Sequence, residues 1–223
     1  MSNYYHGAKA SKQATSVSTP VVADSSIHLI VGAAPVHTVG GKANEPVYAS
    51  NYAEAVAAMG YSDEWDKYDI CEEIYSSFKL YSNGPIIMVN VLDPAKHLKG
   101  AETVEKTLAG GITELPYEAV SDTVEVKGYD GEDSLTEAYT RGEDYDLFYT
   151  DGVLRLERIE SGKIKADNAR LNIKFNSVDP SKVTKKDIIG GYDTNTNKSS
   201  GFELVDSVYP KYGAVSYTHL TLP

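Results

Sequence analysis

Apolar residues at helical and strand spacings organise the stretch from Asn51 to Pro94. In its first part, apolar side chains recur three and four positions apart, which predicts a short helix that Ser50 and Glu54 start and Gly60 ends. The same spacing continues beyond Gly60 and predicts a second, longer helix. The expected buried face of that helix consists of Tyr68, Cys71, Ile74, Tyr75, Phe78 and Tyr81.

A nearly unbroken apolar run at residues 86–92 follows these helices. Asn83-Gly84-Pro85 ends the second helix, because asparagine and glycine accept a left-handed cap and proline cannot continue a helix. An unbroken apolar run is typical of a strand covered on both faces, and residues 26–31 predict another such strand. Residues 25–95 are therefore predicted to form the first part of a layered α/β core domain.

The pattern becomes polar, charged and alternating between residues 96 and 187. Asp151-Gly152 lies between two alternating runs, and this dipeptide is a strong signal for a β-hairpin. Alternation predicts strands at residues 123–127, 145–150, 153–158 and 171–178. We therefore expect an inserted, mostly antiparallel β-rich domain with one solvated face.

Residues 188–215 are expected to return to the core domain, and residues 201–210 within them have the spacing of a short helix. The face predicted to pack on the core consists of Phe202, Val205, Val208 and Tyr209. The predicted fold class is thus α/β, or α+β, with a layered core that the β-rich domain interrupts.

Residues 1–24 are rich in Ser, Thr, Ala and Lys and lack helical periodicity. Such a segment cannot bury much apolar surface by itself. It is either a disordered leader or an extended arm that becomes ordered against a partner, and the residues alone leave both interpretations open.

The composition and charge favour a soluble globular protein and argue against membrane-spanning and nucleic-acid-binding proteins. The chain has 223 residues, of which 41% are hydrophobic, as in an ordinary soluble protein. No run approaches the roughly 18 apolar residues needed to span a bilayer, which predicts a soluble cytoplasmic product with no membrane partner. A net charge of −11 argues against nucleic acid as a partner, because phosphate binding needs a basic surface.

The loop Gly32–Asn44 contains Gly40-Gly41-Lys42 after a predicted strand, as a phosphate-binding loop would. A Walker loop also needs a glycine five positions before the Gly-Lys pair and a hydroxyl after the lysine, where this chain has Val36 and Ala43. We therefore expect a flexible connection. Binding of a nucleotide or small molecule through this loop is the alternative function.

Other candidate chemistry is sparse. Cys71 is the only cysteine, which excludes an intramolecular disulfide, and we expect a small core residue. The acidic clusters Asp130–Asp133 and Glu143–Asp146 lack the EF-hand pattern and are interpreted as solvated turns. The histidines lack metal-ligand spacing; they are His6, His28, His37, His97 and His219. We predict no catalytic residue, no metal site and no cofactor, and hence no enzyme.

Five stretches of the chain occur in an order and spacing that match one family. They are Tyr5-His6-Gly7, residues 52–78 (YAEAVAAMGYSDEWDKYDICEEIYSSF), residues 85–94 (PIIMVNVLDP), residues 178–193 (VDPSKVTKKDIIGGYD) and residues 201–213 (GFELVDSVYPKYG). Together they resemble the contractile tail sheath proteins of bacteriophages and related prophage-like particles. The resemblance covers most of residues 4–213.

This resemblance implies a structural subunit that forms hexameric rings stacked around a tail tube, and contracts on a baseplate signal to drive the tube through the target cell envelope. The implied partners are other copies of the chain, the tail tube protein, and the baseplate and tail terminator proteins. The implied locations are the virion tail and, during assembly, the bacterial host cytoplasm. Arms in this family add strands to neighbouring subunits. The residues expected to make such subunit contacts are Tyr4, Tyr5, His6, Gly7, Val17 and Val21.

The resemblance ends near Val215, whereas members of the sheath family continue well past this point. Residues 216–223 (SYTHLTLP) do not fit the family pattern and are interpreted as a non-native tail. The chain is therefore expected to be an N-terminal fragment of a sheath protein, with an incomplete core domain.

Overall fold

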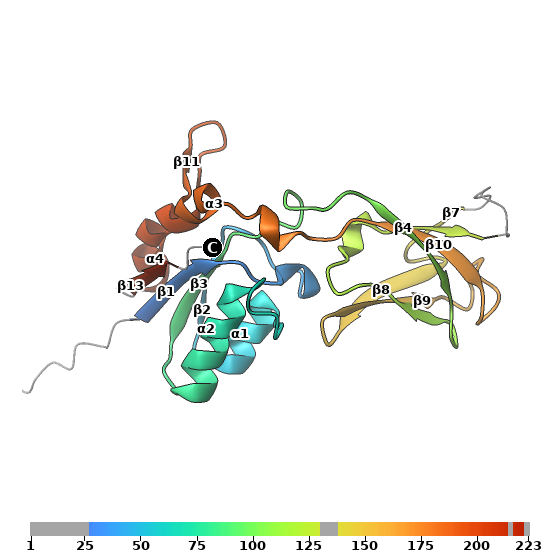
Figure 1. Cartoon of the computed structure of the whole chain (residues 1–223), viewed down its shortest axis with the longest axis horizontal. Coiled ribbons are helices and arrows are strands. Elements are labelled where there is room, and N and C mark those ends of the chain that lie inside the picture. The colour runs from blue at the N-terminus through green and yellow to red at the C-terminus, as the bar shows by residue number, and fades with distance from the viewer. Residues whose placement is uncertain (1–26, 130–137, 214–215, 221–223) are drawn as a thin grey trace, which may run out of the picture.

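The described part of the chain forms two modules that lie side by side (Figure 1). The structure is a computed structural model that describes residues 27–129 and 138–213, together with the backbone of residues 216–220. We call residues 27–97 and 179–220 the core module and residues 98–178 the β module. The chain crosses between them twice, and the crossings are joined where the Asp179 N–H donates to the His97 carbonyl oxygen at 2.8 Å.

The core module is built on a four-stranded sheet, and one of its two inner strands is fully buried. The strands are β1 (Ile27–Gly32), β2 (Pro46–Ala49), β3 (Ile86–Asn90) and β13 (Ser216–Leu220). They lie in the order β13-β1-β3-β2. β1 runs parallel to β3 and β13, and β2 runs antiparallel to β3. All residues of β3 are buried, which confirms the prediction from its unbroken apolar run.

Helices cover both faces of this sheet (Figure 1). They are α1 (Tyr52–Met59), α2 (Asp69–Tyr75), α3 (Lys185–Ile189) and α4 (Val205–Tyr212). Successive strand residues point to opposite faces. Ile30 and Met88 accordingly pack with α1 and α2, whereas Leu29 and Ile87 pack with α3 and α4.

The first helix is confirmed, with a small change at its start. Asn51 is the N-cap, and its side chain accepts a hydrogen bond from the Glu54 N–H. The Ser50 N–H donates in turn to the Glu54 carboxylate at 2.8 Å, so the two residues predicted to start the helix do take part. Gly60 ends it with a positive φ of 74°.

The second helix is shorter and less regular than its spacing predicts. α2 ends at Tyr75, and a π-helical turn, η2 (Ser76–Leu80), continues it. A π turn holds more residues than an α-helical turn, so the residues after it rotate off the predicted face. Tyr68, Cys71 and Ile74 are buried as predicted. Tyr81 is 76% exposed, and the prediction that it is buried is wrong.

The helix predicted at residues 201–210 starts as a 3₁₀ turn, η5 (Gly201–Leu204), and continues as α4. Val208 is buried against the sheet, and Phe202 and Val205 pack partly against it, as expected. Tyr209 is 63% exposed, so its predicted place on this face is wrong. Neighbouring helical residues lie about 100° apart, and Val208 already points at the sheet.

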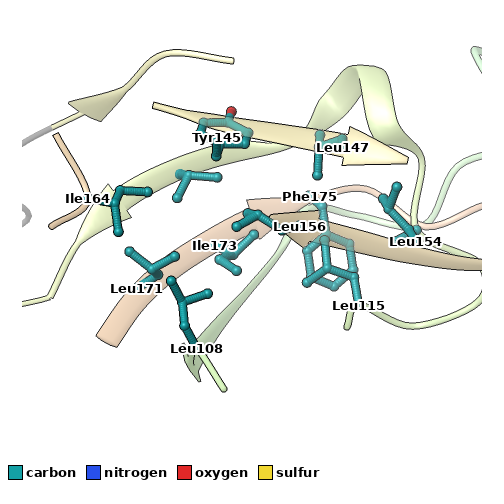
Figure 2. Close-up of a cluster of buried hydrophobic side chains, with 12 residues drawn as sticks. Leu108, Leu115, Tyr145, Leu147, Leu154, Leu156, Ile164, Leu171, Ile173 and Phe175 are labelled. Carbon is teal, nitrogen blue, oxygen red and sulfur yellow. The ribbon is translucent and has the colours of Figure 1, made fainter. Parts of the chain in front are cut away.

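The β module encloses its own apolar cluster between two antiparallel sheets (Figure 2). One sheet has the order β4-β10-β6-β7, formed by β4 (Glu102–Thr107), β10 (Arg170–Phe175), β6 (Glu125–Gly128) and β7 (Ala138–Tyr139). The other has the order β5-β9-β8, formed by β5 (Ile112–Glu114), β9 (Val153–Arg158) and β8 (Tyr145–Thr150). Every strand pair in both sheets is antiparallel among the described residues.

The Asp151-Gly152 hairpin is confirmed with its predicted strand boundaries. β8 and β9 pair antiparallel, and the two turn residues have positive φ angles of 51° and 79°, as a type I′ turn requires. The strand predicted at residues 123–127 begins later, because residues 121–123 form a 3₁₀ turn, η3 (Ser121–Thr123).

Three remaining elements lie in the core module: η1 (Val36–Thr38), η4 (Pro180–Lys182) and the hairpin of β11 (Gly191–Asp193) with β12 (Lys198–Ser200). In Figure 1 the β11–β12 hairpin projects from the core module next to α3. In the part of the chain that the structure describes, no helix has both the length and the apolar character to cross a membrane.

Candidate functional site

The residues predicted to contact other subunits lie outside the described residues. They are Tyr4, Tyr5, His6, Gly7, Val17 and Val21. The acidic cluster Asp130–Asp133 lies outside them too.

The loop Gly32–Asn44 is not the flexible connection that its glycines predict. It contains η1, in which His37 and Thr38 are buried, and the Thr38 hydroxyl donates to the Pro35 carbonyl oxygen at 2.8 Å. The glycines predicted a flexible connection, but the apolar Val36 packs into a buried core cluster, and the neighbouring His37 and Thr38 are buried with it.

The same loop lacks the element that holds phosphate in a Walker loop. There the glycine-rich turn leads into a helix, whose N-terminal N–H groups bind the anion. Here Gly40-Gly41-Lys42 leads into β2. The three residues border a cleft of about 560 Å³, across which Arg141 and Tyr149 of the β module lie.

Cys71 is a core residue, as predicted. Its side chain is fully buried in a cluster with Tyr68 and Leu92, and burial raises the pKa of the thiol to about 12. The thiolate is the reactive form of cysteine. Cys71 therefore has neither the exposure nor the ionisation that a nucleophile needs.

Cys71 is expected not to react with Ellman's reagent in the native protein at neutral pH, and to react fully once guanidinium unfolds the chain. The matched control is Ala57→Cys, which places a second thiol at an exposed position of α1 and is expected to react in the native state. Absorbance at the wavelength of the released thiolate measures both. Rapid native labelling of the wild-type thiol would contradict the buried position.

Asp144 differs from the solvated turn predicted for Glu143–Asp146. Its carboxylate is buried and accepts hydrogen bonds from the Thr140 N–H and the Lys163 N–H, each at 2.8 Å. These bonds hold the pKa of Asp144 below its usual range. The interpretation as a solvated turn is wrong for Asp144, because its carboxylate ties two loops of the β module together; Glu143 and Asp146 are exposed.

Among the described residues, no three His, Cys, Asp or Glu side chains converge in a way that could hold a metal ion. His28 lies on β1, with Nδ1 at 3.9 Å from the Glu73 carboxylate. His97 lies at a crossing between the modules, and its Nδ1 accepts from the Asp93 N–H at 3.0 Å. His6 and the side chain of His219 lie outside the described residues.

Asp187 fastens this crossing to α3. It forms the capping box with Thr184, and it accepts from Lys96 Nζ at 2.9 Å. Although burial alone would raise the pKa of Asp187, the hydrogen bonds from Thr184 and Lys96 hold it well below its usual range. The carboxylate thus stays ionised and structural.

Tyr117 of the β module makes several contacts with the core module. Its hydroxyl donates to the Tyr61 carbonyl oxygen at 2.9 Å, and its own carbonyl oxygen accepts from His37 Nε2 at 3.0 Å. Its ring lies edge-on to Tyr68, with ring centroids 6.2 Å apart. The adjacent Glu118 adds an ion pair with Lys67 at 3.2 Å. No sequence signal pointed to this junction, since its hydrogen bonds join residues that are 56 and 80 positions apart.

The outer edge of β2 is partly covered by the end of α4. The Pro46 carbonyl oxygen accepts from Lys211 Nζ at 3.0 Å and from the Tyr212 hydroxyl. The Tyr48 and Tyr212 rings stack with centroids 5.7 Å apart. Proline offers no N–H to a further strand, so this edge is protected at Pro46.

The described residues thus form buried contacts between the modules and a protected sheet edge, and a comparison of sequences adds a similarity to a known protein. The chain is 28% identical over 216 residues to the tail sheath protein of Burkholderia phage BcepMu, an alignment that covers 96% of this chain. The chain is a relative of phage tail sheath proteins. It spans 42% of the length of that phage protein. No protein-family model matches the chain. No solved structure matches it significantly.

Proposed function

We propose that the chain is a structural, non-enzymatic part of a contractile tail sheath. The sheath subunit polymerises as stacked hexameric rings around a tail tube, and contracts to drive the tube through the envelope of the target cell. Its partners are other copies of itself, the tube protein, and the baseplate and tail terminator proteins. It needs no cofactor. It acts in the virion tail after assembly in the host cytoplasm.

The alignment with a tail sheath protein over 96% of this chain carries the proposal. The module arrangement supports it. The two modules allow a division of roles, in which we expect the core module with its helix-covered sheet to lie towards the tube and the β module to face outward. On the β4-β10-β6 sheet, exposed charges pair across strands, Arg170 with Glu105 and Lys174 with Glu125. Such exposed pairs add little stability and suit a face in contact with water.

The N-terminal segment is proposed as the arm that links subunits. Pro46 and the end of α4 protect one edge of the core sheet, so strand addition there needs displacement of Lys211 and Tyr212. We further propose that contraction is a change between two packed states of the subunits, driven by free energy stored in the packing of the first state.

Negative-stain microscopy of the protein expressed from its complete gene tests the proposal. We expect tubes or rings of uniform diameter, and we expect a variant that lacks residues 2–20 to remain unassembled. Circular dichroism of the variant should match that of the wild type, because the deleted residues precede the described core. A wild-type protein that stays monomeric at high concentration contradicts the sheath function, and a variant that still assembles contradicts only the role of the arm.

A further inference from the structure

His37 is a core-module side chain held between two tyrosines of the β module. It lies on η1 and is 5% exposed. Its ring is nearly perpendicular to the rings of Tyr117 and Tyr149, with centroid distances of 5.8 Å and 6.2 Å. Tyr117 and Tyr149 come from separate parts of the β module, so the imidazole sits where the modules meet.

The hydrogen bonds at His37 fix which ring nitrogen carries the proton. Nε2 lies 3.0 Å from the Tyr117 carbonyl oxygen. A carbonyl oxygen only accepts, so Nε2 carries the hydrogen and Nδ1 is the bare nitrogen of a neutral ring. Nδ1 is buried and has no hydrogen-bond partner among the described residues.

Neither tyrosine hydroxyl is free to serve Nδ1. The Tyr117 hydroxyl donates to the Tyr61 carbonyl oxygen, and the Tyr149 hydroxyl donates to the Ala119 carbonyl oxygen. Because no hydrogen-bond partner lies within reach of Nδ1 among the described residues, a second proton on the ring would place a charged N–H in a buried position without an acceptor, which is costly.

The charged groups around His37 do not offset this cost by contact. The hydrogen bond to the Tyr117 carbonyl oxygen and the charge of Glu118 both favour the protonated ring, but less than burial opposes it, and the Glu118 carboxylate is paired with Lys67. The neighbouring cleft is lined by Lys42, Asp122 and Arg141, of which the last two pair with each other at 3.5 Å. Burial dominates and lowers the pKa of His37.

We propose that His37 is a pH-sensitive latch between the modules, and that its protonation loosens the β module from the core module. This inference goes beyond the sheath function and does not rest on it. The two chain crossings keep the loosened module tethered.

The direction of the pH dependence follows from the lowered pKa. A ring that is exposed after undocking regains an ordinary pKa of about 6.5. The undocked state therefore binds the proton more tightly, and docking is strongest above that value and weakens as the pH falls through it. Each unit by which docking lowers the pKa reduces the docking constant about tenfold once the pH is below both values. Hydrogen bonds from its own backbone and from Lys67 outweigh burial and lower the pKa of Glu118, so that carboxylate stays ionised in this range.

Distance measurements between spin labels on the full chain test the latch. Ala57→Cys on α1 and Glu157→Cys on β9 place labels at exposed positions of the two modules, and the buried Cys71 stays unlabelled. We expect a single narrow distance distribution at about pH 7.5 and a distribution broadened roughly twofold or more at about pH 5. Circular dichroism should show intact secondary structure at both values.

The variant His37→Gln separates the latch from other acid effects. Its amide nitrogen can still donate to the Tyr117 carbonyl oxygen, but it does not titrate, so the narrow distribution should persist at about pH 5. The matched control His97→Gln removes the other buried histidine at the junction and should retain the wild-type broadening. Broadening that persists in His37→Gln, or that is lost only in His97→Gln, overturns the proposal.

A nuclear magnetic resonance titration of the wild-type protein gives an independent test if His37→Gln does not fold. The midpoint of the His37 ring signal is expected below about 6.5 and at the same pH as the midpoint of the distance change. A wild-type distribution that is unchanged between the two pH values, or midpoints that do not coincide, would also overturn the latch.

Discussion

Asn90→Ala is expected to lower the free energy of unfolding of the core module by about 3–5 kcal/mol. Asn90 is fully buried at the end of β3. Its Oδ1 accepts from the Ala34 N–H at 2.9 Å and the Leu92 N–H at 3.0 Å, and its Nδ2 donates to the Leu92 carbonyl oxygen at 2.8 Å. Alanine would leave three buried backbone groups unpaired, and each costs about 1–3 kcal/mol.

Urea unfolding monitored by hydrogen exchange of core-module peptides measures this loss. Asn83→Ala is the matched control, because Asn83 is exposed after η2, and its change should stay within about 0.5 kcal/mol. Equal small effects in both variants would show that water or a rearranged loop satisfies the three groups. That result would remove Asn90 as the residue that fixes the turn between the core sheet and the first crossing.

Phe175→Ala is expected to destabilise the β module by about 3–5 kcal/mol. The Phe175 ring is fully buried in the cluster that also contains Leu115 and Leu156 (Figure 2). Removal of the ring loses the free energy gained by burying it and leaves a cavity between the two sheets. The close-packed neighbours cannot fill that cavity without strain.

The matched control is Phe148→Ala, since Phe148 on β8 is 37% exposed and lies outside this cluster. Its loss is expected to be about 1 kcal/mol or less. Hydrogen exchange should quicken in β-module peptides of Phe175→Ala and much less in those of the core module, because the modules have separate apolar clusters. Equal quickening in both modules would contradict two separate cores.

Local patterns in the sequence were sufficient where a residue's own chemistry decides its conformation. Asp151-Gly152 adopts the positive φ angles of a tight hairpin because those two residue types tolerate them at low cost. The burial of strand β3 follows from its unbroken apolar run, and the burial of Cys71 follows from its place on the apolar face of a helix. These predictions need only neighbours within a few positions.

The same patterns failed where local geometry departs from the ideal period. A π turn after Tyr75 rotates Tyr81 into solvent. Val36 carries the glycine-rich loop into the core, so His37 is buried in a segment whose composition predicts a flexible connection. Asp144 lies in an acidic run but is buried, since backbone N–H groups from two loops satisfy its carboxylate.

The sequence by itself determined the strands with clear apolar or alternating runs, the Asp151-Gly152 hairpin, part of the core and, through the order of its matching stretches, the resemblance to tail sheath proteins. Only the tertiary structure decided how the modules meet. Tyr117, Tyr61 and His37 are far apart along the chain, and their contacts depend on the path of both crossings. The spacing of apolar residues predicts which face of a segment is buried. It does not predict which distant polar group becomes the hydrogen-bond partner of another. The junction, and the latch proposed there, therefore follow from the fold.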